Sequence, residues 1–239
     1  MNNQHTTLFI SDLHLDPHEP NAIQNFFYFL KHIANQSSAL YILGDFFEVY
    51  IGDDDDQSAW LTSIKTALKN VIQLGIPVYF MRGNRDFLIQ KRFAKETGVI
   101  LIPDPYLIRL NGEAILLTHG DSLCTLDVKH QRFRKIVGNK IVQRLFLLLP
   151  LSTRKNIAKK LRKKSTFSNV YKSQTIMDVV ESAVFRQLKQ YSANKIIHGH
   201  THRPCIYSNR IVLGAWHEKG NYLALSHDAV ALHDFEIQK

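Results

Sequence analysis

Short apolar runs alternate with longer amphipathic stretches in the first half of the chain. Three of these runs are expected to be buried strands: residues 7–10, 39–43 and 78–81. Between them, residues 21–34 and 60–74 place apolar side chains at helical spacing, and Gly75 and Pro77 follow the second segment as a stop signal. Strands that alternate with helices at this spacing predict βαβ units and a largely parallel sheet.

The second half of the chain carries a different pattern. Residues 114–118 and 195–197 are again strand-like, and each is followed directly by His and Gly. The tail, residues 210–237, holds short strand-like runs suited to a mixed or antiparallel sheet, whereas residues 128–177 have helical composition and hardly any strand signal. We therefore predict one α/β domain spanning residues 1–239, into which residues 128–177 are inserted as a helical cap.

Cysteine usage and hydropathy predict a cytoplasmic protein. Cys124 and Cys205 are too few for a disulfide framework, so free thiols are expected. Residues 1–7 are polar and lack the features of a signal peptide. The longest apolar run, residues 145–151, is far shorter than the ~20 residues that span a bilayer.

Polar side chains stand just beyond the ends of five predicted strands. They are Asp12 and His14, then Asp45, Asn84 and His119, and finally His200 and His202. Ligands of α/β sheets gather at the carboxyl ends of the strands, so these side chains are expected to converge on one site. Carboxylate, amide and imidazole ligands without sulfur suit divalent ions such as Mn²⁺, Fe²⁺ or Zn²⁺.

Seven candidate ligands are too many for one catalytic ion, which must keep an open position, but they suit two. Two ions ~3.5–4 Å apart stabilise the attacking and leaving oxygens of an in-line phosphoryl displacement. Glycines beside Asp45, Asn84, His119 and His200 let the backbone turn sharply and bring short side chains to the metals. The sequence therefore predicts a two-metal site for phosphate chemistry.

The order of these motifs resembles the calcineurin-like metallophosphoesterase superfamily. Its blocks are Asp-x-His, Gly-Asp-x-x-Glu, Gly-Asn-x-Asp, a single His and Gly-His-x-His, and they run here from residue 12 to residue 202. The superfamily pattern has His after Gly-Asn, whereas Arg85 stands there in this chain. This departure disfavours the usual imidazole general acid and points to a branch that uses a guanidinium. The resemblance implies an α/β/β/α sandwich with an inserted helical cap.

Longer stretches are similar to the family of UDP-2,3-diacylglucosamine pyrophosphohydrolases of lipid A biosynthesis. They are residues 9–15, 44–48, 51–54, 82–88, 119–125, 176–179 and 198–204. The resemblance implies hydrolysis of the substrate pyrophosphate by a hydroxide bound to two Mn²⁺ ions, with attack on the α-phosphorus. The products would be UMP and 2,3-diacylglucosamine 1-phosphate, formed at the cytoplasmic face of the bacterial inner membrane.

The resemblance also implies a role for each motif residue. Asp12, His14 and His202 would hold one Mn²⁺, Asn84, His119 and His200 the other, and Asp45 would bridge them. His198 is the spare histidine, because His-Gly-His-Thr-His by itself does not say which two bind metal. Arg85, which is permanently charged and next to a ligand, suits the negative charge that develops on phosphate oxygens and joins Asp45 as a catalytic residue. The residues that the resemblance assigns to substrate binding are Asn84, Arg85, Asp127, Ser165, Asn169, Lys172 and His200.

Other polar residues have simpler structural explanations. Glu48 and Asp86 are expected to support the ligands or bind backbone. The acidic run at residues 53–56 offers ligands for an extra metal site, but a solvated loop is the favoured interpretation, because adjacent carboxylates cannot all face one ion. Cys124 is expected to be an inert core residue. Trp60 and Trp216 are assigned to packing, and the remaining histidines to the surface or the core: His5, His18, His32, His130, His217, His227 and His233.

The composition, 45% hydrophobic and 21% charged, excludes a disordered or fibrous chain, and the formal net charge of +9 is unevenly distributed. Residues 128–177 contain 14 of the 30 Lys and Arg residues and no Asp or Glu, while the rest of the chain has 16 basic and 21 acidic residues. A nucleic-acid surface would interleave basic residues with aromatics rather than with a Leu-rich run, so no nucleic acid is expected. Basic and apolar residues together favour an anionic membrane surface, or a cleft for acyl chains beside a phosphate. A solvated basic face is the simpler alternative, and no obligate protein partner is inferred.

Two other functions remain open at this point. One is another two-metal phosphodiesterase or a nuclease of the same superfamily, which would cleave a soluble diester or DNA. The other is a non-catalytic basic module that binds membrane or nucleic acid and uses its histidines structurally. Such a module would not be expected to bind about two metal ions per chain.

Overall fold

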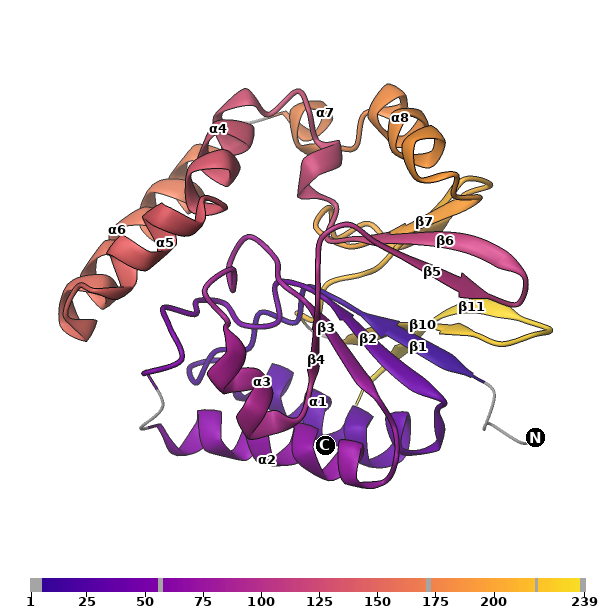
Figure 1. Ribbon diagram of the computed structural model, residues 1–239, viewed down its shortest axis with the longest axis horizontal. Helices are drawn as coiled ribbons and strands as arrows, with labels where there is room; N and C mark the ends of the chain where they lie inside the picture. The colour runs from indigo at the N-terminus through magenta and orange to yellow at the C-terminus, as the bar shows by residue number, and fades with distance from the viewer. Residues whose placement is uncertain (1–5, 56–57, 171–172, 218, 237–239) are drawn as a thin grey trace.

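The computed structural model describes residues 6–55, 58–170, 173–217 and 219–236, and within them two β-sheets lie face to face (Figure 1). In this part of the chain the first sheet has six strands in the order β11 (Val230–Phe235), β10 (Gly220–Leu225), β1 (Thr7–Ile10), β2 (Ala39–Leu43), β3 (Val78–Met81) and β4 (Ile100–Ile102). The second, over the same residues, has the order β5 (Tyr106–Leu110), β6 (Glu113–Thr118), β7 (Lys195–His198), β9 (Arg210–Val212) and β8 (Cys205–Ile206).

The pairing of the strands follows the predicted change of pattern along the chain. Strands β1 to β4 are parallel, with Leu8 opposite Leu40 and Leu40 opposite Val78, which confirms the βαβ prediction. From the tail, β10 and β11 add antiparallel strands to this sheet. In the second sheet β6, β7 and β9 are parallel, and β5 and β8 pair antiparallel at its two edges.

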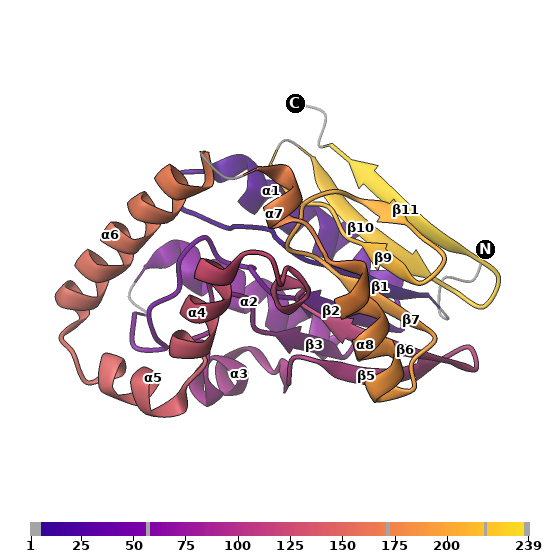
Figure 2. The ribbon, with the colours of Figure 1, turned by 90° about the horizontal axis from the view of Figure 1, so that it is seen from above.

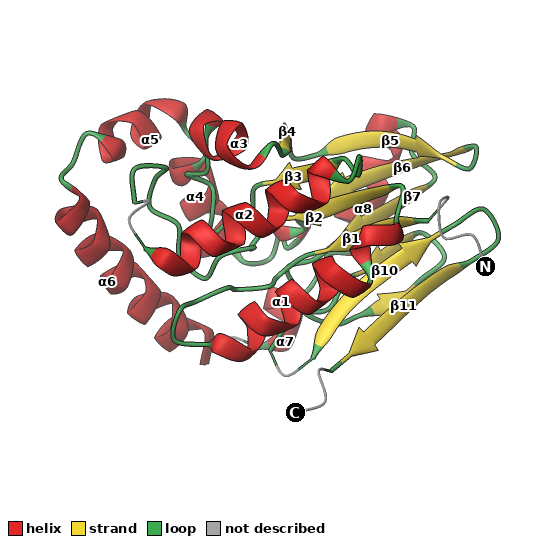
Figure 3. Ribbon diagram, turned by 90° about the horizontal axis from the view of Figure 1, so that it is seen from below, coloured by secondary structure: helices red, strands yellow, loops and turns green. Residues whose placement is uncertain are grey.

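Alternation along the strands divides the apolar side chains of the first sheet between two layers. Leu8 and Ile10 point to one face and pack with Phe26 of helix α1 (Pro20–His32) and Ile64 of helix α2 (Ala59–Gln73). Phe9 points to the opposite face and packs between the two sheets. Figure 3 shows α1 and α2 lying across the outer face of this sheet.

The second sheet uses the same alternation. Ile115 and Leu117 join the layer between the sheets, while Leu116 faces outward and packs on Ala183 and Val184 of helix α8 (Glu181–Tyr191). The layers are therefore helix, sheet, sheet and helix, and the predicted α/β/β/α class is confirmed. Strands β1, β6 and β7 are buried on both faces along most of their length, and their polar residues stand at the strand ends.

The remaining helical segments include three helices, α4 to α6, that follow one another between β6 and β7. In chain order, the remaining segments are η2 (Ala34–Gln36), α3 (Lys91–Thr97), η3 (Asp121–Leu123), α4 (Val128–Val137), α5 (Lys140–Leu147), α6 (Leu151–Val170) and α7 (Gln174–Met177). Helices α4 to α6, which we call the cap helices, form an arc beside the sandwich (Figure 2). Side-chain caps begin two of them, since Asp127 accepts from the His130 N–H and Asn139 accepts from the Ile141 and Val142 N–H groups. No helix within the described ranges is long and apolar enough to cross a membrane.

A buried arginine attaches helix α6 to the core. Arg154 is 2% exposed, and its Nη1 donates to the Ile51 carbonyl at 2.7 Å and to Asp54 Oδ1 at 2.8 Å. Its Nη2 pairs with the other oxygen of the same carboxylate. A bidentate pair of this kind has a fixed geometry, so the first turns of α6 are held against the loop after β2.

The acidic run is a loop, as we expected, but its carboxylates also have protein partners. Asp54 pairs with Arg154, and Asp55 lies 2.9 Å from Lys155. Asp53 accepts hydrogen bonds from the backbone N–H groups of Gln90 and Phe93, at the start of α3. Asp54 is 53% exposed, so the prediction holds in part; the ion pairs with helix α6 were not predicted because Arg154 and Lys155 are distant in sequence, and residue 56 lies outside the described residues.

Candidate metal centre

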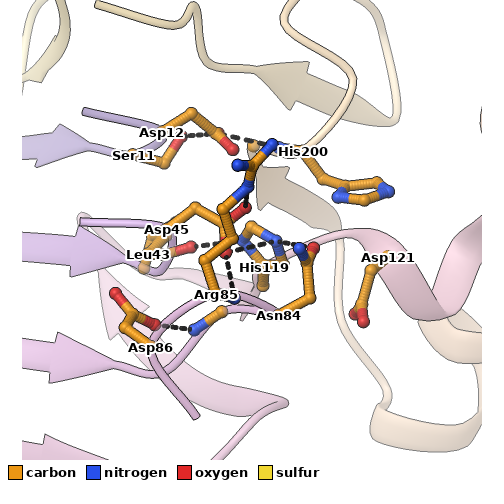
Figure 4. A network of polar contacts seen from close by, with 12 residues as sticks. Ser11, Asp12, Leu43, Asp45, Asn84, Arg85, Asp86, His119, Asp121 and His200 are labelled. Atoms are coloured by element: carbon orange, nitrogen blue, oxygen red, sulfur yellow. Dashed lines mark hydrogen bonds and ion pairs between the residues drawn. The ribbon is translucent and has the colours of Figure 1, made fainter. Parts of the chain in front are cut away.

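Each residue predicted to bind metal lies just after a strand, at one edge of the sandwich. Asp12 and His14 follow β1, Asp45 follows β2, Asn84 follows β3, His119 follows β6, and His200 and His202 follow β7. Figure 4 shows side chains from these separate loops pointing toward a common centre. The parallel strands β1, β2 and β3 end at the same edge, which brings together residues that are far apart in sequence.

The backbone is strained at most of these positions. Seven non-glycine residues in the described part of the chain have a positive φ, and five of them are predicted ligands: Asp12 at 54°, His14 at 50°, Asp45 at 50°, His200 at 67° and His202 at 58°. The left-handed conformation costs a non-glycine residue roughly 1–2 kcal/mol. Strain that is concentrated in this way is typical of a functional site.

Asp12, His14 and His202 form the first group of potential ligands. Asp12 Oδ1 lies 3.3 Å from His202 Nε2 and 3.9 Å from His14 Nε2, and the two imidazole nitrogens are 3.3 Å apart. Asp12 Oδ1 is buried and has no hydrogen bond within the described ranges. Three atoms with lone pairs thus converge on one point, as expected for the ligands of a cation.

Asp45, His119 and His200 form the second group, and the orientation of His119 defines it. His119 Nδ1 donates to the Leu43 carbonyl at 2.9 Å, because a carbonyl oxygen can only accept. In the neutral ring, Nε2 then carries a lone pair, and it faces Asn84 Oδ1 at 3.0 Å and Asp45 Oδ1 at 3.5 Å. Three acceptors around one point need a cation or a proton between them, so these residues fit a divalent metal.

The charges of the two groups agree with this interpretation. Burial alone would lower the pKa of His119, but the carboxylates of Asp45 and Asp12 raise it to about 9. Burial alone would raise the pKa of Asp12, but His202, His119 and His14 lower it well below its usual range. The centre therefore attracts positive charge strongly, although its atoms are withdrawn from water.

His198, the spare histidine, does not join either group. It is buried at the end of β7, where its Nδ1 contacts the Gly199 carbonyl at 2.9 Å, and burial lowers its pKa to about 4. The groups formed by the described residues use His200 and His202 instead. This is the pair implied by the family resemblance.

Two glycines permit the close approach of neighbouring loops. A Cβ atom on Gly83 would overlap Asp45 Oδ1 and the Asp45 backbone nitrogen. A Cβ atom on Gly199 would overlap Asp12 Oδ2 and the Ser11 hydroxyl. The glycines of the sequence motifs therefore leave the space in which the Asp45 and Asp12 carboxylates lie.

Arg85 lies across the second group. Its backbone N–H donates to Asp45 Oδ1 at 2.9 Å, and its Nε lies 3.4 Å from Asp45 Oδ2. Its Nη1 donates to Glu48 Oε2 at 2.7 Å. In Figure 4 its side chain extends past Asp45 toward the centre, so a guanidinium stands beside the second group.

The structure brings only some of the predicted substrate contacts to the centre. Asn84, Arg85 and His200 belong to it, and the buried Asp127 lies at the start of α4, where it caps that helix. Ser165 is exposed on α6, and the structure shows no contact between it and the centre within the described residues. Asn169 lies on the same helix, but its side chain, like Lys172, falls outside what is described.

Two histidines that we assigned to the surface or the core lie at the centre. The His130 ring is 5.3 Å from the His200 ring, and its Nε2 is 3.5 Å from Asp121 Oδ2. The His217 ring stacks on His14 at 6.1 Å and lies 5.5 Å from His202. His217 is exposed, in agreement with a surface assignment, and His130 is half-buried; their position beside the candidate ligands was not predicted, because neither residue belongs to a motif. The one signal that the sequence offers for His217 is the tryptophan before it. Trp216 is buried, and its backbone N–H donates to the Asp12 carbonyl at 3.0 Å, which places the next residue beside the centre.

Three supporting residues are placed as we predicted. Asp86 accepts backbone N–H groups from Gly83 and Phe46, at 2.6 and 2.7 Å, and so fixes two loops of the centre without facing a metal position. Cys124 is buried, and burial raises the pKa of its thiol to about 12, so it is not a nucleophile. Trp216 packs in the core.

Known proteins that are similar in sequence to this chain are phosphoesterases and hydrolases, in agreement with a metal centre for phosphate chemistry. A family described as calcineurin-like phosphoesterase matches residues 5–204. A protein of Pectobacterium carotovorum subsp. carotovorum (strain PC1), named UDP-2,3-diacylglucosamine hydrolase, is 50% identical over 237 residues, which cover 96% of this chain and 98% of the relative. Proteins of the same name from Proteus mirabilis (strain HI4320) and Serratia proteamaculans (strain 568) are 49% and 47% identical, with the same coverage. The chain therefore belongs to the calcineurin-like phosphoesterase family, and within it to the group formed by these relatives.

Proposed function

We propose that this protein hydrolyses the pyrophosphate bond of UDP-2,3-diacylglucosamine and releases UMP and 2,3-diacylglucosamine 1-phosphate, a reaction of lipid A biosynthesis. The observation that carries the proposal is the pair of ligand groups beside the Arg85 guanidinium, in a chain that matches its hydrolase relatives over 96% of its length. Ligands for two cations beside a fixed guanidinium form a site for a phosphate anhydride.

We propose two Mn²⁺ ions per chain. Asp12, His14 and His202 would hold one, Asn84, His119 and His200 the other, and Asp45 would contact both. A donor set of carboxylate, amide and imidazole without sulfur supports a borderline ion such as Mn²⁺. Bound in this way, two divalent ions supply a water of lowered pKa and neutralise the charge of phosphate oxygens.

Protein groups would position the substrate and stabilise its transition state. The Arg85 guanidinium lies across the second group, where it can neutralise charge that develops on the α-phosphate. Asn84 directs its Oδ1 toward His119, which leaves its amide N–H groups available to a phosphate oxygen. Asp45 holds the Arg85 backbone and side chain together and so keeps the guanidinium in place.

The cap helices support a substrate with acyl chains. A cavity of about 370 Å³ lies between helix α6 and the loop after β2; Val49, Ile51 and Ala158 line it together with charged side chains, most of them basic residues of α6 such as Arg162. Exposed apolar side chains also gather on the cap helices; Leu145 is 61% exposed and Leu148 80%. Basic and apolar groups together suit an acyl chain beside a phosphate, and peripheral contact with an anionic membrane on the cytoplasmic side.

A comparison of substrates tests this proposal. Purified protein with Mn²⁺ should release UMP from UDP-2,3-diacylglucosamine in mixed micelles, and a chelator should stop the release. A soluble chromogenic diester and DNA should be cleaved slowly or not at all. Rapid cleavage of either one, without cleavage of the lipid, would replace the proposal by a different phosphodiesterase of the same family.

A further inference from the structure

Glu48 lies at a junction between the core and the cap helices. Its backbone N–H donates to the Leu15 carbonyl at 3.1 Å, and the preceding residue, Phe47, is buried and forms a bridge with Leu15. The side chain therefore leaves a fixed backbone, and it is 20% exposed. Its carboxylate is not one of the ligand groups found among the described residues.

Three groups from separate parts of the chain contact this one carboxylate. Oε2 accepts from Arg85 Nη1 at 2.7 Å and lies 3.2 Å from His14 Nδ1. Oε1 pairs with the Arg162 guanidinium of helix α6. Burial would raise the pKa of Glu48, but His14, Arg85 and Arg162 lower it, so the carboxylate carries its charge at neutral pH.

The contact with Arg85 matters because a free arginine side chain has many rotamers. A mobile guanidinium loses rotamer entropy when it is fixed at the reaction centre, and contacts with the protein can fix it before the substrate binds. Asp45 holds the Nε end of Arg85, and Glu48 holds Nη1, so the plane of the guanidinium is defined at two points. A group aimed before the substrate binds stabilises the transition state without reorganisation.

We propose that Glu48 is a positioning residue that aims the Arg85 guanidinium at the phosphate of the substrate. The inference rests on the proposed function, because Arg85 has a role only if a phosphate is attacked there. Glu48 acts through Arg85 and touches no reacting atom. Its contact with Arg162 links the same carboxylate to helix α6, so one side chain connects Arg85 with the cap helices.

A double-mutant cycle tests the inference. Glu48→Gln keeps the size of the side chain and an acceptor oxygen but removes the charge. It should lower kcat about 10-fold, as is usual for a partner of an active-site group, and leave KM within about 2-fold of the wild type. Arg85→Ala should lower kcat by at least about 100-fold. In the Arg85→Ala background, Glu48→Gln should have little further effect, because residues that act as a unit are not additive.

Glu96→Gln is the matched control. Glu96 also bridges two cations, Lys65 at 2.6 Å and Arg92 at 2.8 Å, but it lies on helix α3 and has no contact with the centre within the described part of the chain. This variant should keep the wild-type kcat and KM. Bound metal per chain should equal that of the wild type in both Gln variants.

Two results would overturn the inference. If the losses of Glu48→Gln and Arg85→Ala multiply in the double variant, Glu48 does not act through Arg85. If Glu48→Gln loses metal together with activity, Glu48 acts through His14 instead. A wild-type protein that releases no UMP would be a failure of the proposed function and is recognised before the cycle begins.

Discussion

The backbone N–H of His200 donates a hydrogen bond of 2.8 Å to Asp12 Oδ2, across 188 positions of the chain. The same oxygen accepts from the Ser11 hydroxyl at 2.6 Å, so Oδ1 is left to face His14 and His202. The carboxylate of the first ligand group therefore holds the backbone of a residue in the second. This hydrogen bond fixes the position of one group relative to the other. It therefore also helps to fix the distance between the two ions that the groups would bind.

Asp12→Asn should separate this structural role from the metal role. Asparagine keeps an acceptor for the His200 N–H but removes the negative charge. We expect the fold to be retained, by circular dichroism, and metal affinity to fall by more than about 100-fold, since loss of a supporting partner alone costs 10–100-fold. Full retention of metal, measured by elemental analysis after dialysis, would show that Asp12 is not a ligand.

Arg85→Ala and Arg85→Lys should lower activity without loss of metal, in contrast to Asp12→Asn. Both should keep the metal content of the wild type, because the candidate ligands are other residues. Alanine should lower kcat by about 10²–10³-fold. Lysine should recover part of this loss, since it restores the charge but not the planar group that spans Asp45 and Glu48. Loss of metal in the alanine variant would argue against a role in phosphate binding.

Gly83→Ala should displace the Asp45 carboxylate, because the new Cβ atom would overlap Asp45 Oδ1. Metal affinity and kcat should fall together. Gly75→Ala is the matched control: Gly75 has a φ of +86°, but a Cβ atom there would meet open space. The control should lose about 1 kcal/mol of stability from backbone strain and keep its metal. Equal metal affinity in the two variants would contradict the assigned role of Gly83.

The Arg154–Asp54 pair should give the protein an acid-sensitive contact between α6 and the core. The hydrogen bonds from Arg154 lower the pKa of Asp54 below its ordinary 3.8. Because the pKa of Asp54 is lower in the folded state, the pair makes its full contribution to the free energy of unfolding above pH 3.8. This contribution is lost as the pH falls through the lower pKa of the folded state. Because Asp54 is half exposed, the contribution is about 1 kcal/mol or less. Urea unfolding should show Asp54→Asn as less stable than the wild type at pH 7, with a difference that shrinks toward pH 3; a difference independent of pH would contradict this.

Removal of metal should abolish activity without unfolding the chain, because both sheets are held by their own apolar layers. The melting temperature should nevertheless fall, since an ion that binds only the folded state stabilises it. Mn²⁺ added back should restore both activity and melting temperature. Full activity after exhaustive chelation, with metal analysis at background, would exclude a metal-dependent reaction.

The fold could be predicted from the sequence because its signals are local. The runs at residues 7–10, 39–43 and 78–81 are apolar on both faces, and such strands need helices or a second sheet over them. The candidate ligands follow the same strands directly, so predicting the strands also predicted that these side chains would meet. The order of the motifs along the chain predicted the remaining residues of the centre.

Contacts between distant segments could not be predicted in the same way. His130 and His217 reach the centre from α4 and from the loop before β10, and no spacing in the sequence relates them to the ligands. The ion pairs of the acidic run were not predicted because their partners, including Arg154, lie up to 100 positions away. Charge counts show where basic residues concentrate, but not which acidic residue each of them meets.

The central claim is that this chain hydrolyses UDP-2,3-diacylglucosamine by attack of water on the α-phosphorus. The most direct test is the reaction of purified protein with Mn²⁺ and this lipid in water enriched in ¹⁸O, with both products analysed by mass spectrometry. We predict one ¹⁸O atom in UMP and none in 2,3-diacylglucosamine 1-phosphate. Label in the lipid phosphate would contradict the site of attack, and the absence of UMP would contradict the function.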